Sequence, residues 1–138
     1  MANSVQKLDY FAVDVAHRPG EGARLLSAIA DAGVNLIAVT GFPRSAGEGQ
    51  VDFVPADADT FRKAAEQAGI KLREPKAVFI IQGDDQPGAL AESLRTLAEA
   101  DINVTAADAV AAGQGRFGAM LWVKPEDVER AATALGAD

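Results

Sequence analysis

The feature that most constrains the fold of this chain is an internal repeat with a spacing of 68 residues. At this spacing Pro19 matches Pro87, Gly20 matches Gly88 and Asn35 matches Asn103. Further identical pairs within this stretch are Ala23 and Ala91, Leu26 and Leu94, Ala30 and Ala98, and Ala32 and Ala100. The match is gapless from a polar turn, through an amphipathic stretch, into the next apolar run. Such a period indicates one structural unit written twice.

The first copy reads as strand, helix, strand, strand, helix, strand. Alternation of apolar and polar residues predicts the first strand, helical spacing of Leu25, Leu26 and Ile29 predicts the first helix, and Gly33 can end that helix in a left-handed cap. Asp57 or Asp59 can start the second helix. The predicted elements are strand Leu8–Val15, helix Gly20–Ala32, strands Val34–Gly41 and Gln50–Val54, a helix ending at Gly69, and a short strand Ile70–Arg73.

The second copy begins near Lys76 and repeats this order. Its predicted elements are strand Ala77–Gln82, helix Pro87–Ala100, strands Asn103–Val110 and Arg116–Val123, and a helix that opens at Pro125. Pro suits the first helical turn, and Asp85 is placed to cap the helix. Because the sequence ends at Asp138, little room remains for a fourth strand. The long first strand of the first copy, or a partner chain, would fill that sheet edge.

A βαββαβ unit is the ferredoxin-like architecture, so we predict an α+β fold with two tandem units, residues 1–74 and 75–138, the second with a short or missing fourth strand. A unit of this size buries only about 60% of its chain surface and is marginal alone. Both faces of the second copy's strands are apolar, with Val78, Ile80, Met120 and Trp122 on one of them. We therefore expect that face to pack on another sheet, from this chain or from a second copy.

Composition excludes several classes of function. The 13 Lys and Arg against 20 Asp and Glu give a net charge of −7, which disfavours nucleic-acid binding. The absence of Cys removes disulfides and thiolate zinc sites and fits a cytoplasmic location. Apolar runs such as Ala77–Ile81 are too short to span a bilayer, and the first residues lack the apolar core of a signal peptide.

The turn after each first strand resembles the signature of the ACT domain, a small-ligand sensing module found on amino-acid biosynthesis enzymes. The second copy has Asp85-Gln86-Pro87-Gly88-Ala89-Leu90 and then Asp101-Ile102-Asn103-Val104. The first copy has His17-Arg18-Pro19-Gly20-Glu21-Gly22 and then Gly33-Val34-Asn35-Leu36. It departs from the family pattern at His17, where Asp or Asn is usual, and at Gly22, where Leu is usual. Either Gly22 widens a ligand site, or the first copy has drifted.

The resemblance implies a regulatory protein that binds a small molecule, such as an amino acid, between two ACT units. It further implies a homodimer, a biosynthetic enzyme or regulator as partner, and no cofactor or metal. Carried over from the family, the ligand-binding residues are His17, Arg18, Gly20, Glu21, Gly22 with Asn35 beside them, and Asp85, Gln86, Gly88, Ala89 and Asn103. An α-carboxylate suits the N–H groups at a helix start, with Arg18 as a charge partner.

Three alternatives compete with ligand sensing. The first is a scaffold that docks on a metabolic enzyme or regulator without a ligand. An enzyme is disfavoured because His17 is the one histidine and Cys is absent, so a nucleophile with an orienting base has few sources. An RNA-binding module shares the βαββαβ order but needs sheet aromatics flanked by basic residues, whereas Gln50–Val54 carries Asp52 beside its one Phe.

Overall fold

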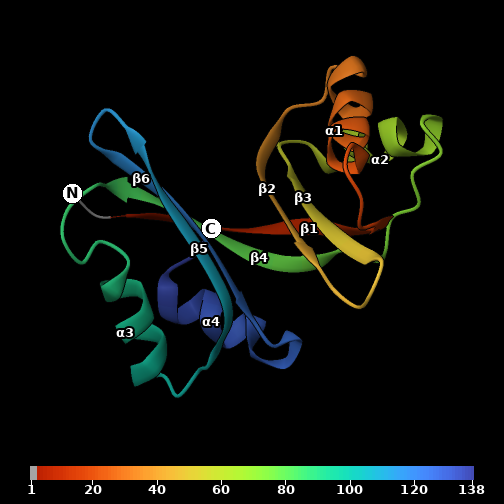
Figure 1. The fold of residues 1–138 in the computed structure, drawn as a ribbon. Coiled ribbons are helices and arrows are strands. Elements are labelled where there is room, and N and C mark those ends of the chain that lie inside the picture. The colour runs from red at the N-terminus through yellow and green to blue at the C-terminus, as the bar shows by residue number, and fades with distance from the viewer. Residues whose placement is uncertain (1–2) are drawn as a thin grey trace. The chain divides into compact units, whose positions relative to one another are not determined.

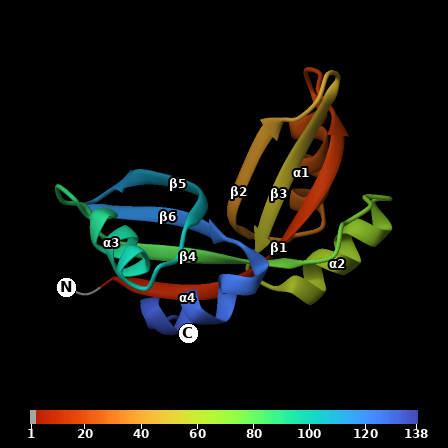
Figure 2. The same ribbon diagram turned by 90° about the horizontal axis from the view of Figure 1, so that it is seen from below.

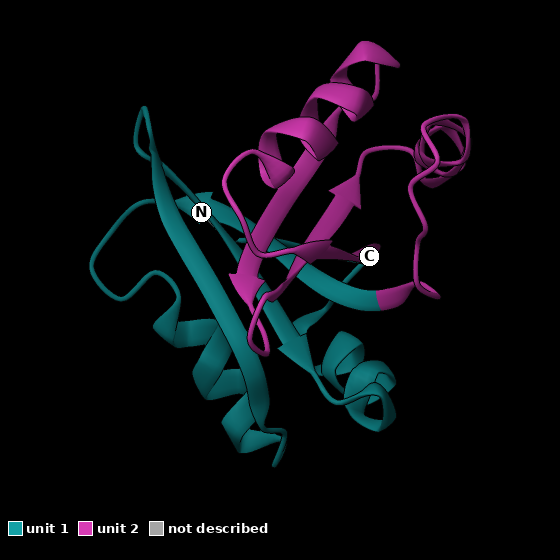
Figure 3. Ribbon diagram, turned by 45° about the vertical axis from the view of Figure 1, so that its right-hand side comes forward, with its two compact units in different colours: residues 1–8, 77–138 teal, residues 9–76 magenta. Residues whose placement is uncertain are grey.

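The computed structural model describes residues 3–138 and has the predicted α+β architecture (Figure 1). The chain divides into two compact units: unit 1 comprises residues 1–8 and 77–138, and unit 2 comprises residues 9–76 (Figure 3). The strands are hydrogen-bonded in the order β2-β3-β1-β4-β6-β5. The elements are β1 (Ser4–Ala16), α1 (Glu21–Asp31), β2 (Leu36–Pro43), β3 (Glu48–Pro55), α2 (Ala58–Gln67), β4 (Lys76–Asp84), α3 (Ala91–Glu99), β5 (Val104–Gly113), β6 (Arg116–Val123), a 3-10 turn (Pro125–Asp127) and α4 (Val128–Leu135).

Unit 2 places α1 and α2 on one face of β2, β3 and the second part of β1 (Figure 1). The antiparallel register pairs Phe11 with Phe53 and Val13 with Val51, so these side chains point to the same face. Phe61 of α2 lies 5.2 Å from the Phe11 ring and 5.5 Å from the Phe53 ring, measured between centroids. The core of unit 2 is therefore built around three aromatic rings under the helices.

Unit 1 repeats the arrangement with α3 and α4 against β4, β6 and β5 (Figure 2). Phe79 and Ile81 of β4 pair with Leu121 and Ala119 of β6, and all of these residues belong to one buried cluster. On the other face of the strands Val78, Ile80 and Trp122 are also buried. That a second sheet covers this face stays a prediction.

The fourth-strand position of unit 1 is taken by the chain's own first strand. β1 is the neighbour of β4 in the strand order, and its first residues belong to unit 1. Asp138 lies beside these residues: its N–H donates to the Val5 carbonyl, and its carbonyl accepts from the Lys7 N–H, both at 3.1 Å. β1 begins at Ser4, earlier than predicted, because it serves both units. The boundaries between the compact units lie after Leu8, within β1, and after Lys76, while the division into repeats at residues 1–74 and 75–138 stays a prediction.

Several local signals read from the sequence are confirmed. Asp57 caps α2, its carboxylate accepting from the N–H groups of Asp59 and Thr60. Gly33 follows α1 with a φ of +76°. Gly20 and Gly88, the repeated turn glycines, have φ values of +94° and +76°. Since a left-handed backbone is strained for residues with a Cβ, this conformation explains why both copies carry Gly there.

Two local predictions are wrong. Ile70–Arg73 forms no strand, although the Arg73 N–H donates to the Ala12 carbonyl at 3.0 Å. Asp85 does not cap a helix, because Pro87–Leu90 form turns and α3 starts only at Ala91. The Asp85 N–H instead donates to the Gly115 carbonyl at 2.8 Å.

None of the helices in residues 3–138 is both long enough and apolar enough to cross a membrane.

Candidate functional site

A pocket of about 230 Å³ lies in unit 2 at the turn between β1 and α1. We call it the turn pocket. Four of its residues were predicted from the sequence to bind a ligand. The end of β2 and the start of β3, which were not predicted, also line it, and the lining contains both charged and apolar groups. Its lining residues are Val15, Ala16, His17, Arg18, Glu21, Gly22, Gly41, Phe42, Pro43, Gly49, Gln50 and Val51.

Strand direction brings these residues to one edge of the unit. β1 and β2 both pair antiparallel with β3, so β1 and β2 run parallel and end at the same edge. At that edge Ala16 pairs with Glu48, and Pro43 pairs with Gly49. The end of β2 and the start of β3 therefore face the turn that leads into α1.

Two glycines, Gly22 and Gly49, line the turn pocket and leave space there because they have no side chain. A Cβ placed on Gly22, in the first turn of α1, would meet no atom within 4 Å. A Cβ on Gly49 would lie 3.4 Å from Cγ2 of Val15 and 3.9 Å from Cβ of His17. Gly22 therefore faces free space, whereas Gly49 lets β3 pass close to the turn.

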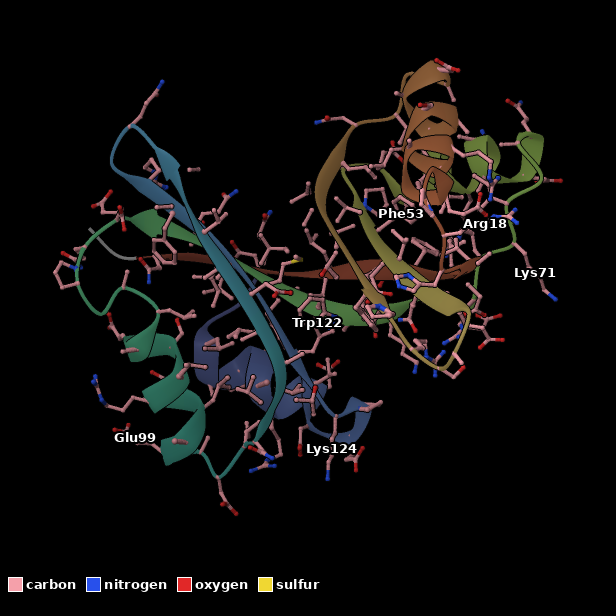
Figure 4. The ribbon with its side chains drawn as sticks, viewed as in Figure 1. Arg18, Phe53, Lys71, Glu99, Trp122 and Lys124 are labelled. Carbon is pink, nitrogen blue, oxygen red and sulfur yellow. The ribbon has the colours of Figure 1, made fainter. Side chains whose placement is uncertain are left out.

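The charged lining of the turn pocket includes Arg18 and Glu21 (Figure 4 labels Arg18), and Arg24 follows Glu21 on α1. Arg24 Nε donates to Glu21 Oε2 at 3.2 Å. This hydrogen bond, together with the positive charges of Arg24 and Arg18, lowers the pKa of the Glu21 carboxyl. Glu21 is thus an ionised carboxylate that is already hydrogen-bonded to Arg24. The Arg18 guanidinium lines the pocket and can bind an anionic group.

The start of α1 adds to the positive character of this site. The N-cap residue is Gly20, which provides no side-chain oxygen for the first N–H groups of the helix. Unsatisfied N–H groups and the helix dipole attract carboxylates and other anions. The lining of the pocket also includes the apolar residues Val15, Val51, Phe42 and Pro43. The site can therefore hold a ligand with one anionic end and an apolar part.

In unit 1 the corresponding space is filled. Leu90 takes the position of Gly22 at the 68-residue spacing, and it packs against the buried cluster of unit 1. Gly83 pairs with Phe117 in unit 1 as Val15 pairs with Gly49 in unit 2, and Phe117 is 6% exposed. Beside them, Arg116 Nη1 donates to Asp84 Oδ1 at 2.9 Å. The large residues Leu90 and Phe117 stand where unit 2 has glycines.

The structure separates the predicted site residues into four places. His17, Arg18, Glu21 and Gly22 line the turn pocket, and Gly20 lies within the same turn. Asp85, Gln86, Gly88 and Ala89 lie in the equivalent turn of unit 1, where the Ala89 N–H donates to the Gln86 carbonyl at 3.1 Å.

Asn35 does not lie beside the turn, which corrects the sequence-based expectation. Its carbonyl accepts from the Ala56 N–H at 3.1 Å, past the end of β3 where Leu36 pairs with Pro55. The turn lies at the other end of β3, near Glu48, about 23 Å away at roughly 3.3 Å per residue. Asn103, which precedes β5, is likewise at the far end of unit 1.

Sequence reasoning missed the lining residues from the second and third strands, namely Gly41, Phe42, Pro43, Gly49, Gln50 and Val51. A usable signal was present. A strand-helix-strand connection makes the first two strands parallel, so the end of the second strand, rather than its start at Asn35, comes level with the first turn.

A buried carboxylate lies in unit 2 outside the pocket lining. Asp52 is 5% exposed and pairs across the strands with Ala12 and Thr40. Burial raises the pKa of the Asp52 carboxyl, and this effect is partly opposed by the hydrogen bond that Gln50 Nε2 donates to Asp52 Oδ1 at 2.7 Å. Gln50 thus connects the turn pocket to a titratable group.

In a comparison with known protein families, residues 77–137, which lie in unit 1, match the family described as the ACT domain. No curated protein matches the chain significantly in sequence.

Solved structures share the fold over nearly the whole chain. Protein BT0572 of Bacteroides thetaiotaomicron is 19% identical with a TM-score of 0.78, over 97% of this chain and 88% of that protein. The regulatory subunit of aspartate kinase from Thermus thermophilus is 18% identical with a TM-score of 0.63, over 98% and 93%. That of Thermus flavus is 21% identical with a TM-score of 0.58, over 98% and 94%. At these identities the matches show the fold alone.

Proposed function

We propose that this protein is a regulatory module that binds an amino acid or a related small metabolite in the turn pocket of unit 2. The observation that carries the proposal is the pocket itself, whose lining combines the cationic Arg18 with apolar residues such as Phe42 and Val51. The ACT domain match at residues 77–137 and the shared fold with aspartate kinase regulatory subunits support a regulatory role.

In this proposal the ligand's carboxylate binds Arg18 and the N–H groups at the start of α1, and Glu21 receives its ammonium group. Residues 9–76 act as a second ACT-like unit despite their departures at His17 and Gly22. The protein has no catalytic role and needs no cofactor or metal. It works in the cytoplasm as a homodimer, and a biosynthetic enzyme or a regulator binds it and responds to its ligand.

Regulation requires that the ligand favour one conformation over another. We expect the ligand to slow amide hydrogen exchange in the first turn of α1 and at the end of β2, since both line the pocket. A ligand that binds without altering exchange or partner affinity would support binding but not regulation.

A thermal-shift screen against the amino acids and their 2-oxo acids tests the proposal. A ligand at 100 times its dissociation constant adds about 2.7 kcal/mol to the free energy of unfolding, which raises the melting temperature by several degrees. Arg18→Ala should reduce the shift. Arg95→Ala is the matched control, because it removes one exposed positive charge from α3 in unit 1.

A flat screen with well-folded protein would refute ligand sensing and favour the scaffold. The exposed apolar side chains of Ile37 and Val39 on β2, 40% and 41% exposed, are candidates for such docking. Loss of partner capture in Ile37→Ser, with Arg18→Ala unaffected, would then identify a protein-binding role.

A further inference from the structure

We infer that the turn pocket selects an amino acid with an uncharged, leucine-sized side chain, and that each chain binds one such ligand. This inference rests on the proposed function and names both the ligand class and the stoichiometry.

The size of the ligand side chain follows from comparing the two units. Gly22 and Leu90 are equivalent at the 68-residue spacing. Leu90 packs its own side chain on the core of unit 1, while a Cβ on Gly22 would meet nothing within 4 Å. In the first turn of its helix, the first copy therefore lacks the apolar side chain that the second copy has at the equivalent position. A ligand side chain of similar size would restore that packing.

The apolar character of the ligand side chain follows from the lining. Val15, Phe42, Pro43 and Val51 offer carbon surface and no charge. Among the described residues that line the pocket, Glu21 is the one carboxylate, and Arg24 already donates to it. The side-chain ammonium of lysine would thus lack a carboxylate of its own. A second ligand carboxylate, as in aspartate, would compete with the first for Arg18.

The stoichiometry of one ligand per chain follows from the side chains that fill the equivalent space in unit 1. Phe117 pairs with Gly83 at the position where unit 2 pairs Gly49 with Val15. Both Phe117 and Leu90 belong to the packed cluster of unit 1. The side chains of unit 1 thus occupy the space that a ligand would take, so one site per chain results.

Titration calorimetry on the full chain tests the ligand class with a graded series of leucine, norvaline, 2-aminobutyrate and alanine, followed by lysine and aspartate. Each methylene removed should weaken binding about fourfold, so alanine should bind roughly 50-fold more weakly than leucine. The expected stoichiometry is one ligand per chain. Tighter binding of lysine or aspartate than of leucine, or two ligands per chain, would overturn the inference.

The variant Gly22→Leu tests the location by placing in unit 2 the residue of unit 1. It should weaken leucine binding at least 100-fold, while Gly22→Ala, which adds only a methyl group, should weaken it less than tenfold. Both variants should keep the wild-type circular dichroism spectrum, because Gly22 has an ordinary helical backbone. Unchanged leucine binding in Gly22→Leu would refute the inference.

The outcomes separate this inference from the proposed function. If a polar amino acid binds once and Gly22→Leu abolishes its binding, ligand sensing in the turn pocket stands and the apolar specificity falls. If no compound binds, the proposed function fails and the inference fails with it.

Discussion

Substitutions at Gly22 should raise the free energy of unfolding of the ligand-free protein while they weaken ligand binding. Gly22 is the second residue of α1, so Gly22→Ala should stabilise unit 2 by about 1 kcal/mol through helix propensity alone. Gly22→Leu has a similar propensity but adds three further carbon atoms. Full burial of these atoms would contribute about 2.4 kcal/mol, at roughly 0.8 kcal/mol for each methylene.

The expected gain of Leu over Ala is about 1 kcal/mol, because the equivalent Leu90 is only partly buried. Urea denaturation followed by circular dichroism, without ligand, measures both variants against the wild type. The predicted order of stability is Leu, then Ala, then Gly. If Gly22→Leu is less stable than Gly22→Ala, the space beside Gly22 is not complementary to a leucine side chain, and the reasoning about the ligand fails as well.

Three further predictions concern unit 2. Asp52→Asn should stabilise the protein at pH 7. Burial raises the folded pKa of Asp52 above the ordinary 3.8, so its ionisation costs stability increasingly as pH rises from 3.8, and the cost is complete above the folded pKa. This advantage should vanish below pH 3.8, and urea midpoints with the same difference at pH 7 and pH 3.5 would contradict the assignment. Phe53→Ala should cost about 3–5 kcal/mol, since Phe53 is fully buried against the Phe61 ring, and a loss below 1 kcal/mol in urea denaturation would disprove that packing. Asp57→Ala should cost about 1 kcal/mol through loss of the α2 cap, whereas Asp57→Ser should restore most of it in thermal unfolding.

Much of the fold follows from signals that are local in the sequence. The 68-residue repeat predicts two similar units, and the alternation in β1 together with the helical spacing in α1 predicts their element order. Asp57 and Gly33 behave as predicted because capping depends on a few neighbouring residues. The turn glycines of both copies are conformational requirements of the same kind.

Some local predictions failed because contacts with distant residues override the local signal, and predictions about distant partners stayed open. Nothing local in residues 4–8 indicates that they occupy the edge beside β4. Asp85 was expected to cap α3, yet its N–H bonds to Gly115, which follows β5 in the chain. Edge pairing is set by contacts between residues far apart in sequence, so a local pattern does not specify it.

The candidate site divides in the same way. The sequence by itself determined the turn from His17 to Gly22, and with it the charged side of the pocket. Only the tertiary structure decided that the ends of β2 and the start of β3 form the apolar wall and that Asn35 lies at the far edge. The physical reason is strand direction and register: they fix which strand ends meet, and they arise from the packing of the whole sheet rather than from any one segment.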